Sequence, residues 1–238
     1  MPIGLKTLDS AFDRAGTAST REDWFFRLAS ICAFVVVAIF LFQEVVLRVA
    51  PSPSTTDEWL ATPLSAIERV RMALMFSLFF FSLTTYAGVA FRLGDAAARL
   101  GLVFATIACV IELAYRAVEM RAVPAWAEAY RQAQDPALRD ILRARVDAFQ
   151  DVTASLYGVI RGAAFCTNLS FAAALRKSEG LARGIQLLFL LNAVRLSINY
   201  VKPLAPGLEP ILDWMFILIL APLYACLGVW LWRSKDKA

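Results

Sequence analysis

The sequence contains six long apolar runs, and this feature constrains the fold more than any other. Each run reaches the length of about 20 residues that a helix needs to cross a hydrocarbon core. A helix satisfies its own backbone hydrogen bonds in lipid, and the alternating pattern of barrel strands is absent from these runs. The runs predict one transmembrane domain, residues 1–238, that folds as an all-α, polytopic membrane bundle. Its six spans are expected at residues 24–49, 67–92, 97–119, 152–175, 183–203 and 210–232.

The composition agrees with a membrane protein and argues against several other classes of function. Hydrophobic residues make up 59% of the chain and are grouped in separate runs. The net charge is +4, but the basic residues lie at the ends of these runs without interleaved aromatic residues, so nucleic-acid binding is not expected. The chain has no histidine, which excludes His-ligated haem, most zinc and di-iron sites, and catalytic pairs that need an imidazole. No cofactor or metal site is predicted.

The distribution of Lys and Arg predicts the orientation, because cytoplasmic loops carry an excess of these residues. With six spans, the N-terminal segment, the second and fourth loops and the C-terminal segment lie on one side, and all of them carry Lys or Arg. The first loop has only Arg48 and the fifth only Lys202. Both termini are therefore expected in the cytoplasm. Ala-rich and Arg-rich usage fits a GC-rich bacterial genome, so we expect a multi-pass protein of the bacterial cell membrane.

The N-terminal segment, residues 1–23, lacks the pattern of a signal peptide. Leu5, Leu8 and Phe12 recur at helical spacing in it. The segment is expected to be either an interfacial helix on the membrane surface or a flexible cytoplasmic tail, and the sequence leaves both alternatives open.

The long third loop, residues 120–151, is expected to be external and helical. Its arginines are balanced by acidic residues, so it does not contradict the orientation. Asp135 as N-cap and Pro136 in the first turn predict a helix from about residue 136 to residue 176, whose first turns project from the membrane. A short helix is expected before it, around "PAWAEAYRQ".

Two shorter motifs carry structural predictions. The Pro, Ser and Thr residues of "APSPSTTDEWLATP" predict an exposed loop between the first two spans. Gly158 and Gly162 flank Arg161 at a small-xxx-small spacing, which predicts a close approach of another helix at that point.

Charged and amide side chains inside three of the predicted spans form the candidate site. Each charge near the middle of a membrane costs about 2.5 to 3.5 kcal/mol, so such residues are expected to face the bundle interior. In the predicted orientation they fall in the outer halves of the third, fourth and fifth spans. The predicted ligand-binding residues are Glu112, Arg116, Glu119, Tyr157, Arg161, Asn192, Arg195 and Asn199.

Two arrangements of these residues remain open. In the first, the deepest acid, Glu112, meets Arg161 and Arg195 in one network that lines an outward-facing cavity, with Glu44 and Asp213 near its outer end. In the second, Glu112 pairs with Arg116 of its own helix at the favourable four-residue spacing, and the remaining charges reach headgroup water. The first arrangement assumes that the third, fourth and fifth spans contact one another.

Three functions follow from these arrangements. The first is the binding or transport of a small zwitterionic or anionic molecule, or of a lipid headgroup, in the outward-facing cavity. The second is a structural or regulatory membrane subunit without catalysis. The third is an intramembrane enzyme without histidine that uses Glu112 as an acid or base. No catalytic residue is assigned and a non-enzymatic function is favoured. The lipid bilayer is the expected environment, and a homo-oligomer or a partner membrane protein is compatible with the sequence.

The segments "IELAYRAVEM" and "LLFLLNAVRLS", together with the spacing of the spans from the second to the sixth, resemble those of uncharacterised bacterial membrane proteins with six helices, which are grouped as a domain of unknown function. This resemblance implies the same six-span fold. It implies no substrate and no catalytic residue.

Overall fold

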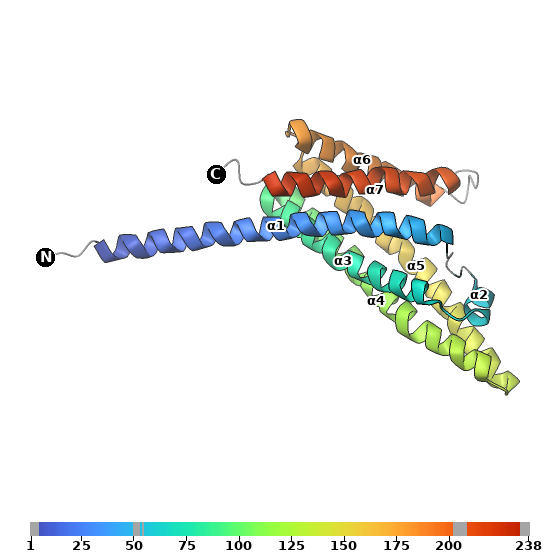
Figure 1. Cartoon of the computed structure of the whole chain (residues 1–238). Coiled ribbons are helices and arrows are strands. Elements are labelled where there is room, and N and C mark those ends of the chain that lie inside the picture. Colours follow the sequence, from blue (N-terminus) through green and yellow to red (C-terminus); the bar gives the residue numbers. More distant parts are fainter. Residues whose placement is uncertain (1–4, 50–52, 54, 202–208, 234–238) are drawn as a thin grey trace.

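The computed structural model describes residues 5–49, 53, 55–201 and 209–233 of the chain. Within them the chain forms seven helices and no strand, which confirms the all-α prediction. Six helices are long, and one short helix lies between the first two long ones (Figure 1). They are α1 (Leu5–Val49), α2 (Thr56–Ala61), α3 (Ala66–Leu93), α4 (Ala96–Gln132), α5 (Pro136–Ala174), α6 (Gly180–Val201) and α7 (Glu209–Trp232).

The six long helices form a closed ring. Its order is α1, α3, α4, α5, α6 and α7, and α7 packs against α1 to complete it. Successive members of the ring are also successive long helices in the chain, and the short connections make them antiparallel. A closed ring has a centre that side chains from every helix can reach, and this is where the candidate site lies.

Local sequence signals explain where these helices begin and end. Gly94 ends α3 in the left-handed conformation with φ 68°, and the side chain of Asp95 then accepts a hydrogen bond from the backbone of Ala98 to cap α4. Asp135 caps α5 in the same way, with Pro136 at its first position. The predicted start of this helix is therefore confirmed. The predicted end, residue 176, lies two residues beyond Ala174.

Five of the long helices are long and apolar enough to cross a membrane, which indicates a membrane-embedded protein. Large apolar side chains such as Ile31, Phe80, Val103 and Leu218 are more than half exposed on the outside of the ring, as expected for a surface that faces lipid. α5 is long enough to cross a membrane, but it is not among these five helices. Five of the six predicted spans are therefore found as candidate spans, and the predicted span at residues 152–175 is not. The candidate segments are Asp23–Val46, Ala66–Leu93, Ala96–Gln132, Gly180–Ile198 and Met215–Trp232.

Residues 120–151 form a helical hairpin rather than a separate small helix followed by a long one. α4 continues without a break through Pro124 to Gln132, and α5 begins four residues later. In Figure 1 this part of α4 and α5 extends beyond the ends of the other helices. We call the end at which α4 and α5 are joined the hairpin end, and the opposite end, where Gly94 joins α3 to α4, the Gly94 end.

The first loop is partly folded, in contrast to the exposed loop that its composition predicts. α2 lies within it and packs against α4 and α5. Trp59 and Leu60 of α2 are buried in a small second core with Val123 and Val146 of the hairpin. The burial of these two apolar side chains stabilises α2, although the Pro, Ser and Thr residues around it favour turns.

α1 is one continuous helix from Leu5, so the N-terminal segment and the first predicted span belong to the same element. Of the two alternatives for residues 1–23, a helical segment is therefore found from Leu5 onwards, while residues 1–4 lie outside the described part. Figure 1 shows the first turns of α1 extending past the Gly94 end of the ring.

The main core fills the ring at the Gly94 end. Phe171 of α5 stacks between Tyr86 of α3 and Phe189 of α6, with ring centroids 5.5 Å and 5.4 Å apart. Phe171 and Phe189 are completely buried. The same core contains fully buried aliphatic side chains from α6, from α7 and from the residue that follows α5, namely Leu175, Ile185, Leu223, Leu227 and Leu231.

Candidate ligand-binding cavity

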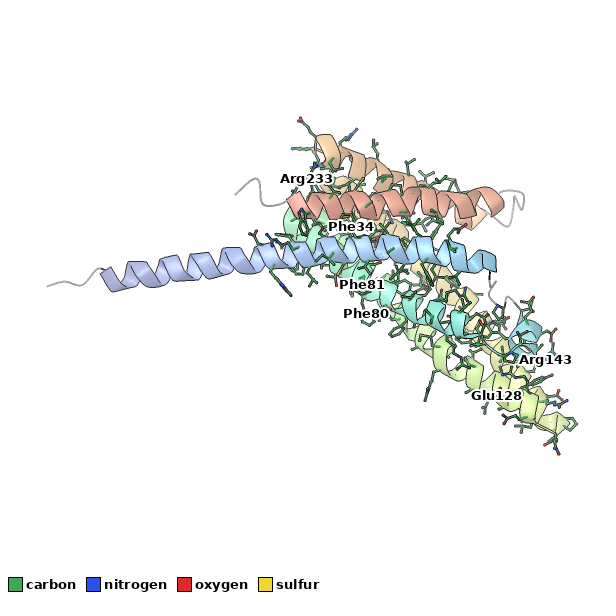
Figure 2. All side chains as sticks on the ribbon, viewed as in Figure 1. Phe34, Phe80, Phe81, Glu128, Arg143 and Arg233 are labelled. Carbon is green, nitrogen blue, oxygen red and sulfur yellow. The ribbon has the colours of Figure 1, made fainter. Side chains whose placement is uncertain are left out.

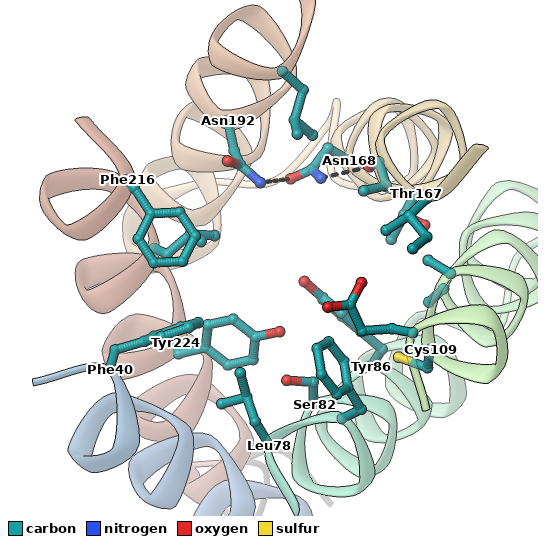
Figure 3. Close-up of a pocket in the computed structure, with 18 of the residues that line it drawn as sticks. Phe40, Leu78, Ser82, Tyr86, Cys109, Thr167, Asn168, Asn192, Phe216 and Tyr224 are labelled. Carbon is teal, nitrogen blue, oxygen red and sulfur yellow. Dashed lines mark hydrogen bonds between the residues drawn. The ribbon is translucent and has the colours of Figure 1, made fainter. Parts of the chain in front are cut away.

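A cavity of about 330 Å³ occupies the centre of the ring, next to this core. Each of the six long helices contributes to its wall, which is mainly apolar and aromatic. Figure 3 shows Asn168 and Asn192 on one side of the cavity and Ser82, Tyr86 and Tyr224 on the other. Its polar and charged lining residues are Ser82, Tyr86, Glu112, Arg116, Tyr157, Thr167, Asn168, Asn192, Arg195 and Tyr224. We call it the central cavity.

One polar cluster joins α4 to α5 at this cavity. The hydroxyl of Tyr115 lies 2.5 Å from Glu112 Oε1 and donates to it, and it lies 2.6 Å from the hydroxyl of Tyr157. Arg116 Nη2 donates to the Tyr157 hydroxyl at 3.3 Å and to Glu112 Oε1 at 3.4 Å. Glu112 is buried, and these contacts supply the partners that a buried carboxylate requires.

Arg116 is paired with two acids of its own helix. Its Nη1 lies 2.5 Å from Glu119 Oε2, in addition to the contact of Nη2 with Glu112. The spacings of three and four residues place all three side chains on one face of α4. In the described residues, Glu112 is therefore paired within its helix, as in the second arrangement, and not with Arg161 as in the first.

A second polar cluster joins α5 to α6. Asn192 Nδ2 donates to Asn168 Oδ1 at 3.0 Å, and Arg195 Nε donates to Asn192 Oδ1 at 3.0 Å. The guanidinium of Arg195 also lies 5.2 Å from the centre of the Phe216 ring on α7. Asn168 of α5 therefore holds Asn192 in place, and Asn192 in turn holds the buried guanidinium of Arg195 at the wall of the cavity.

The eight predicted ligand-binding residues divide into three groups. Five line the central cavity: Glu112, Arg116, Tyr157, Asn192 and Arg195. Glu119 and Arg161 do not line it; the guanidinium of Arg161 lies over the ring of Tyr157, 5.7 Å from its centre. The side chains of Asn199 and Asp213 lie outside the described residues. Of the contacts assumed among the third, fourth and fifth predicted spans, those of the fourth with both others are found, because α5 packs against both α4 and α6.

A second cavity, of about 350 Å³, adjoins the central one on the side of the hairpin end. Glu119 lines it together with Gln43 of α1 and Arg71 of α3. Both Arg71 and Glu119 are nearer the hairpin end of their helices than the residues that line only the central cavity. We call it the hairpin-side cavity. The residues that line both cavities are Phe40, Met75, Arg116, Tyr157 and Phe216.

Several residues that line the two cavities are not among the predicted ligand-binding residues. Arg71 lies in the second turn of α3, where an arginine ordinarily reaches the interface, so nothing in its position distinguishes it from such a residue. Thr167 and Asn168 are almost completely buried. Asn168 lies deeper in its span than the predicted residues Tyr157 and Arg161, but it is eleven residues, or about three turns, from Tyr157 on the same face of α5, and this spacing is the signal that could have identified it.

A Cβ atom added to Gly158 would meet no atom within 4 Å, so the close approach predicted from the spacing of Gly158 and Gly162 is not seen at the first of these two glycines. The close approaches occur elsewhere. A Cβ on Gly88 of α3 would lie 2.5 Å from the Cβ of Ala29 on α1, and one on Gly228 of α7 would lie 2.9 Å from the Phe34 ring. These glycines let α1 pack closely against both of its neighbours in the ring.

The chemistry of the central cavity is that of a binding site for a polar group within apolar walls. It offers two guanidinium groups, one carboxylate, two amides and several hydroxyls. Among the described residues, no three His, Cys, Asp or Glu side chains come together as a set of metal ligands.

No protein-family model matches the sequence, and no curated protein and no solved structure matches the chain. Its function therefore has to be inferred from the geometry of its own residues.

Proposed function

We propose that the chain crosses the bilayer six times, with α5 as the sixth span, and that both termini face the cytoplasm of a bacterial cell. Support comes from the ring, which α5 completes between α4 and α6. The polar Thr167 and Asn168 of α5 are each 2% exposed, whereas Val159 on its outer face is 52% exposed. These two polar residues, which lower the hydropathy of α5, therefore turn away from lipid. The hairpin end is then external, and the likeness to the uncharacterised six-helix bacterial family belongs to this proposal.

The orientation has a direct test in a bacterial host. A green fluorescent protein fused to the C-terminus is expected to fluoresce, because it folds in the cytoplasm. A periplasm-dependent phosphatase fused at the same position is expected to be inactive. Phosphatase activity together with loss of fluorescence would overturn the proposed cytoplasmic position of the C-terminus.

We further propose that the central cavity binds a small amphiphilic molecule with an anionic or zwitterionic group, such as the headgroup end of a lipid. The observation that carries this proposal is that Arg116 of α4 and Arg195 of α6 line the same apolar cavity as the carboxylate of Glu112. A guanidinium at a site of low dielectric binds carboxylate or phosphate strongly, and the carboxylate can receive the cationic part of a zwitterion.

The apolar wall favours an amphiphile over a fully polar solute. Phe40, Leu78, Phe79, Leu196 and Leu220 line the same cavity and would be left against water by a purely polar ligand. The packed aromatic side chains at the Gly94 end support binding rather than passage through the ring, since Phe171 and Phe189 leave no exposed surface there.

Native mass spectrometry of the gently solubilised protein tests this function. We expect a small molecule to remain bound to the unmodified chain, or dihexanoyl phosphatidylglycerol to bind when added, and Arg195→Gln to reduce the bound fraction by about tenfold. Arg183→Gln is the matched control, because Arg183 lies on the same helix but is exposed and does not line the cavity. Equal binding by both variants, or no binding by the unmodified chain, would overturn the proposal.

A further inference from the structure

The hairpin-side cavity holds two guanidinium groups and one carboxylate, as the central cavity does, but its second arginine is Arg71 of α3 instead of Arg195 of α6. Arg71 of α3 and Arg116 of α4 line it from neighbouring helices, and Glu119 is the acid in its wall. Arg71 is within electrostatic range of Arg116, of Glu119 and of Glu68, whose carboxylate lies outside this cavity and accepts a hydrogen bond from the backbone of Ser65. Two guanidinium groups therefore face one carboxylate around a space of about 350 Å³.

Both arginines have a buried donor that the surrounding protein does not use. Among the residues that the structure describes, neither Arg71 Nε nor Arg116 Nε has a hydrogen-bond partner, although both atoms are buried. The two terminal nitrogens of Arg116 are occupied by Glu119, Glu112 and Tyr157. Leaving a charged donor buried without an acceptor is costly, so each of these N–H groups favours an oxygen supplied from the cavity.

The position of Arg71 indicates where such an oxygen comes from. Arg71 is five residues after the start of α3, which places it about 8 Å along the helix axis from that end. A helix of 28 residues is about 42 Å long, which matches a bilayer with its headgroup layers, so a residue about 8 Å from the end of α3 in a six-span topology lies near the headgroup layer. Donors that converge from two helices suit a phosphate group, which presents more acceptor oxygens than a carboxylate does.

We propose that the hairpin-side cavity is a phosphate-binding site, in which Arg71 and Arg116 together hold one phosphate group. The inference deepens the function proposed above, because Arg116 and Tyr157 line both cavities and a phosphate held there lies next to the central cavity. The hairpin-side cavity then receives the phosphate of an amphiphile, and the rest of its headgroup and the start of its apolar part lie in the central cavity beside Arg195 and Glu112.

Titration calorimetry of the full-length protein in a neutral detergent tests the site with two probes, inorganic phosphate and dihexanoyl phosphatidylglycerol. Dihexanoyl glycerol, which lacks the phosphate, is the negative probe. We expect Arg71→Gln to weaken binding of the phosphatidylglycerol by at least about tenfold. Arg69→Gln removes the same charge two residues away, where the side chain is exposed and outside this cavity, and is expected to change the affinity by less than about twofold.

The two probes separate the sources of the phosphate. Binding of both probes with equal dependence on Arg71 indicates a site for free phosphate, and binding of the lipid alone indicates a headgroup site. Arg71→Lys keeps the positive charge but lacks the guanidinium group. Its affinity for the phosphatidylglycerol is expected to lie between those of the unmodified chain and of Arg71→Gln, and this graded loss separates phosphate recognition from misfolding.

The outcomes also distinguish this site from the central cavity. Binding of neither probe, or unchanged affinity in Arg71→Gln, overturns the phosphate site even where Arg195→Gln still loses the molecule retained in mass spectrometry. Loss of inorganic phosphate binding in Arg71→Gln, with no effect of Arg195→Gln on any ligand, overturns the function of the central cavity and leaves the phosphate site standing.

Discussion

The two ends of the six-helix ring are built from different side chains. At the Gly94 end, Tyr86, Phe171 and Phe189 stack across the interior, and fully buried leucines close the space around them. Towards the hairpin end, the interior holds two adjoining cavities with Arg71 and Arg116 in their walls. The same helices therefore enclose a packed core at one end and a hollow, charged space at the other, and a ligand is expected to enter from the hairpin end.

Small residues make the packed end compact. The Phe171 ring lies against Gly101 of α4, where an added Cβ would be 3.2 Å from the ring. Gly88 permits a similar approach between α3 and α1. No such filling occurs at the level of the central cavity, where Phe40 and Phe216 form part of the wall instead. Small residues and stacked rings therefore fill the interior at the Gly94 end.

The largest effect is expected from Phe171→Ala at the packed end. Phe171 is completely buried between two aromatic rings, so its removal leaves a cavity and should reduce the free energy of unfolding by about 3 to 5 kcal/mol. Leu169→Ala, two residues away on the lipid-facing side and 40% exposed, is the control and should cost much less. Denaturant titration in detergent measures both. Equal losses in the two variants would show that the Gly94 end is not a packed core.

A smaller effect is expected from a pair of identical substitutions placed at the two ends. Gly88→Ala puts a methyl group 2.5 Å from the Cβ of Ala29, and the required displacement of α1 should cost about 1 to 3 kcal/mol. Gly158→Ala, nearer the hairpin end, meets nothing within 4 Å and should be neutral or stabilise by up to about 1 kcal/mol through helix propensity. Thermal unfolding of the two variants side by side measures the difference. A destabilising Gly158→Ala would mean that another helix packs there.

Gly88 and Gly158 also show how much of such a fold can be predicted from the sequence. Hydrophobic length and the caps at Asp135 and Pro136 are local signals, so the helices were predictable from them. Close approach depends on which helix lies opposite, and the spacing of Gly158 and Gly162 contains no such information. The continuity of α4 through Pro124 and the burial of Trp59 were missed for the same reason, since both depend on packing between α2 and the hairpin.

For the candidate site, the sequence predicts that polar residues face the ring interior, but it does not predict which individual side chains line a cavity. Polar residues within apolar helices turn towards the ring interior because lipid cannot solvate them, and this rule alone places Glu112, Asn192 and Arg195 at the cavity. It does not distinguish Arg161, which leans on Tyr157, from Arg71, which lines the hairpin-side cavity. Arg161 lies well inside its predicted span and Arg71 lies near the end of its own, so depth favours Arg161, and only the contacts in three dimensions show that Arg71 lines the hairpin-side cavity.

The smallest effect is expected on the hairpin itself, at the salt bridge between Arg143 of α5 and Asp57 of α2. Its two charged atoms are 2.7 Å apart, but the side chains are 46% and 73% exposed. Figure 2 shows Arg143 on the hairpin, on the side of the molecule away from Phe34 and Arg233. Water screens an exposed pair, and α2 remains attached through buried Trp59, so Arg143→Gln should cost at most about 0.5 kcal/mol.

A double-mutant cycle with Asp57→Asn, repeated at high salt, measures the coupling between the two charges. A coupling above about 2 kcal/mol that persists in high salt would mean that water does not reach this surface. The hairpin would then be covered in the membrane by lipid or by a partner protein, and the entrance to the cavities could no longer be placed at an open, solvated end.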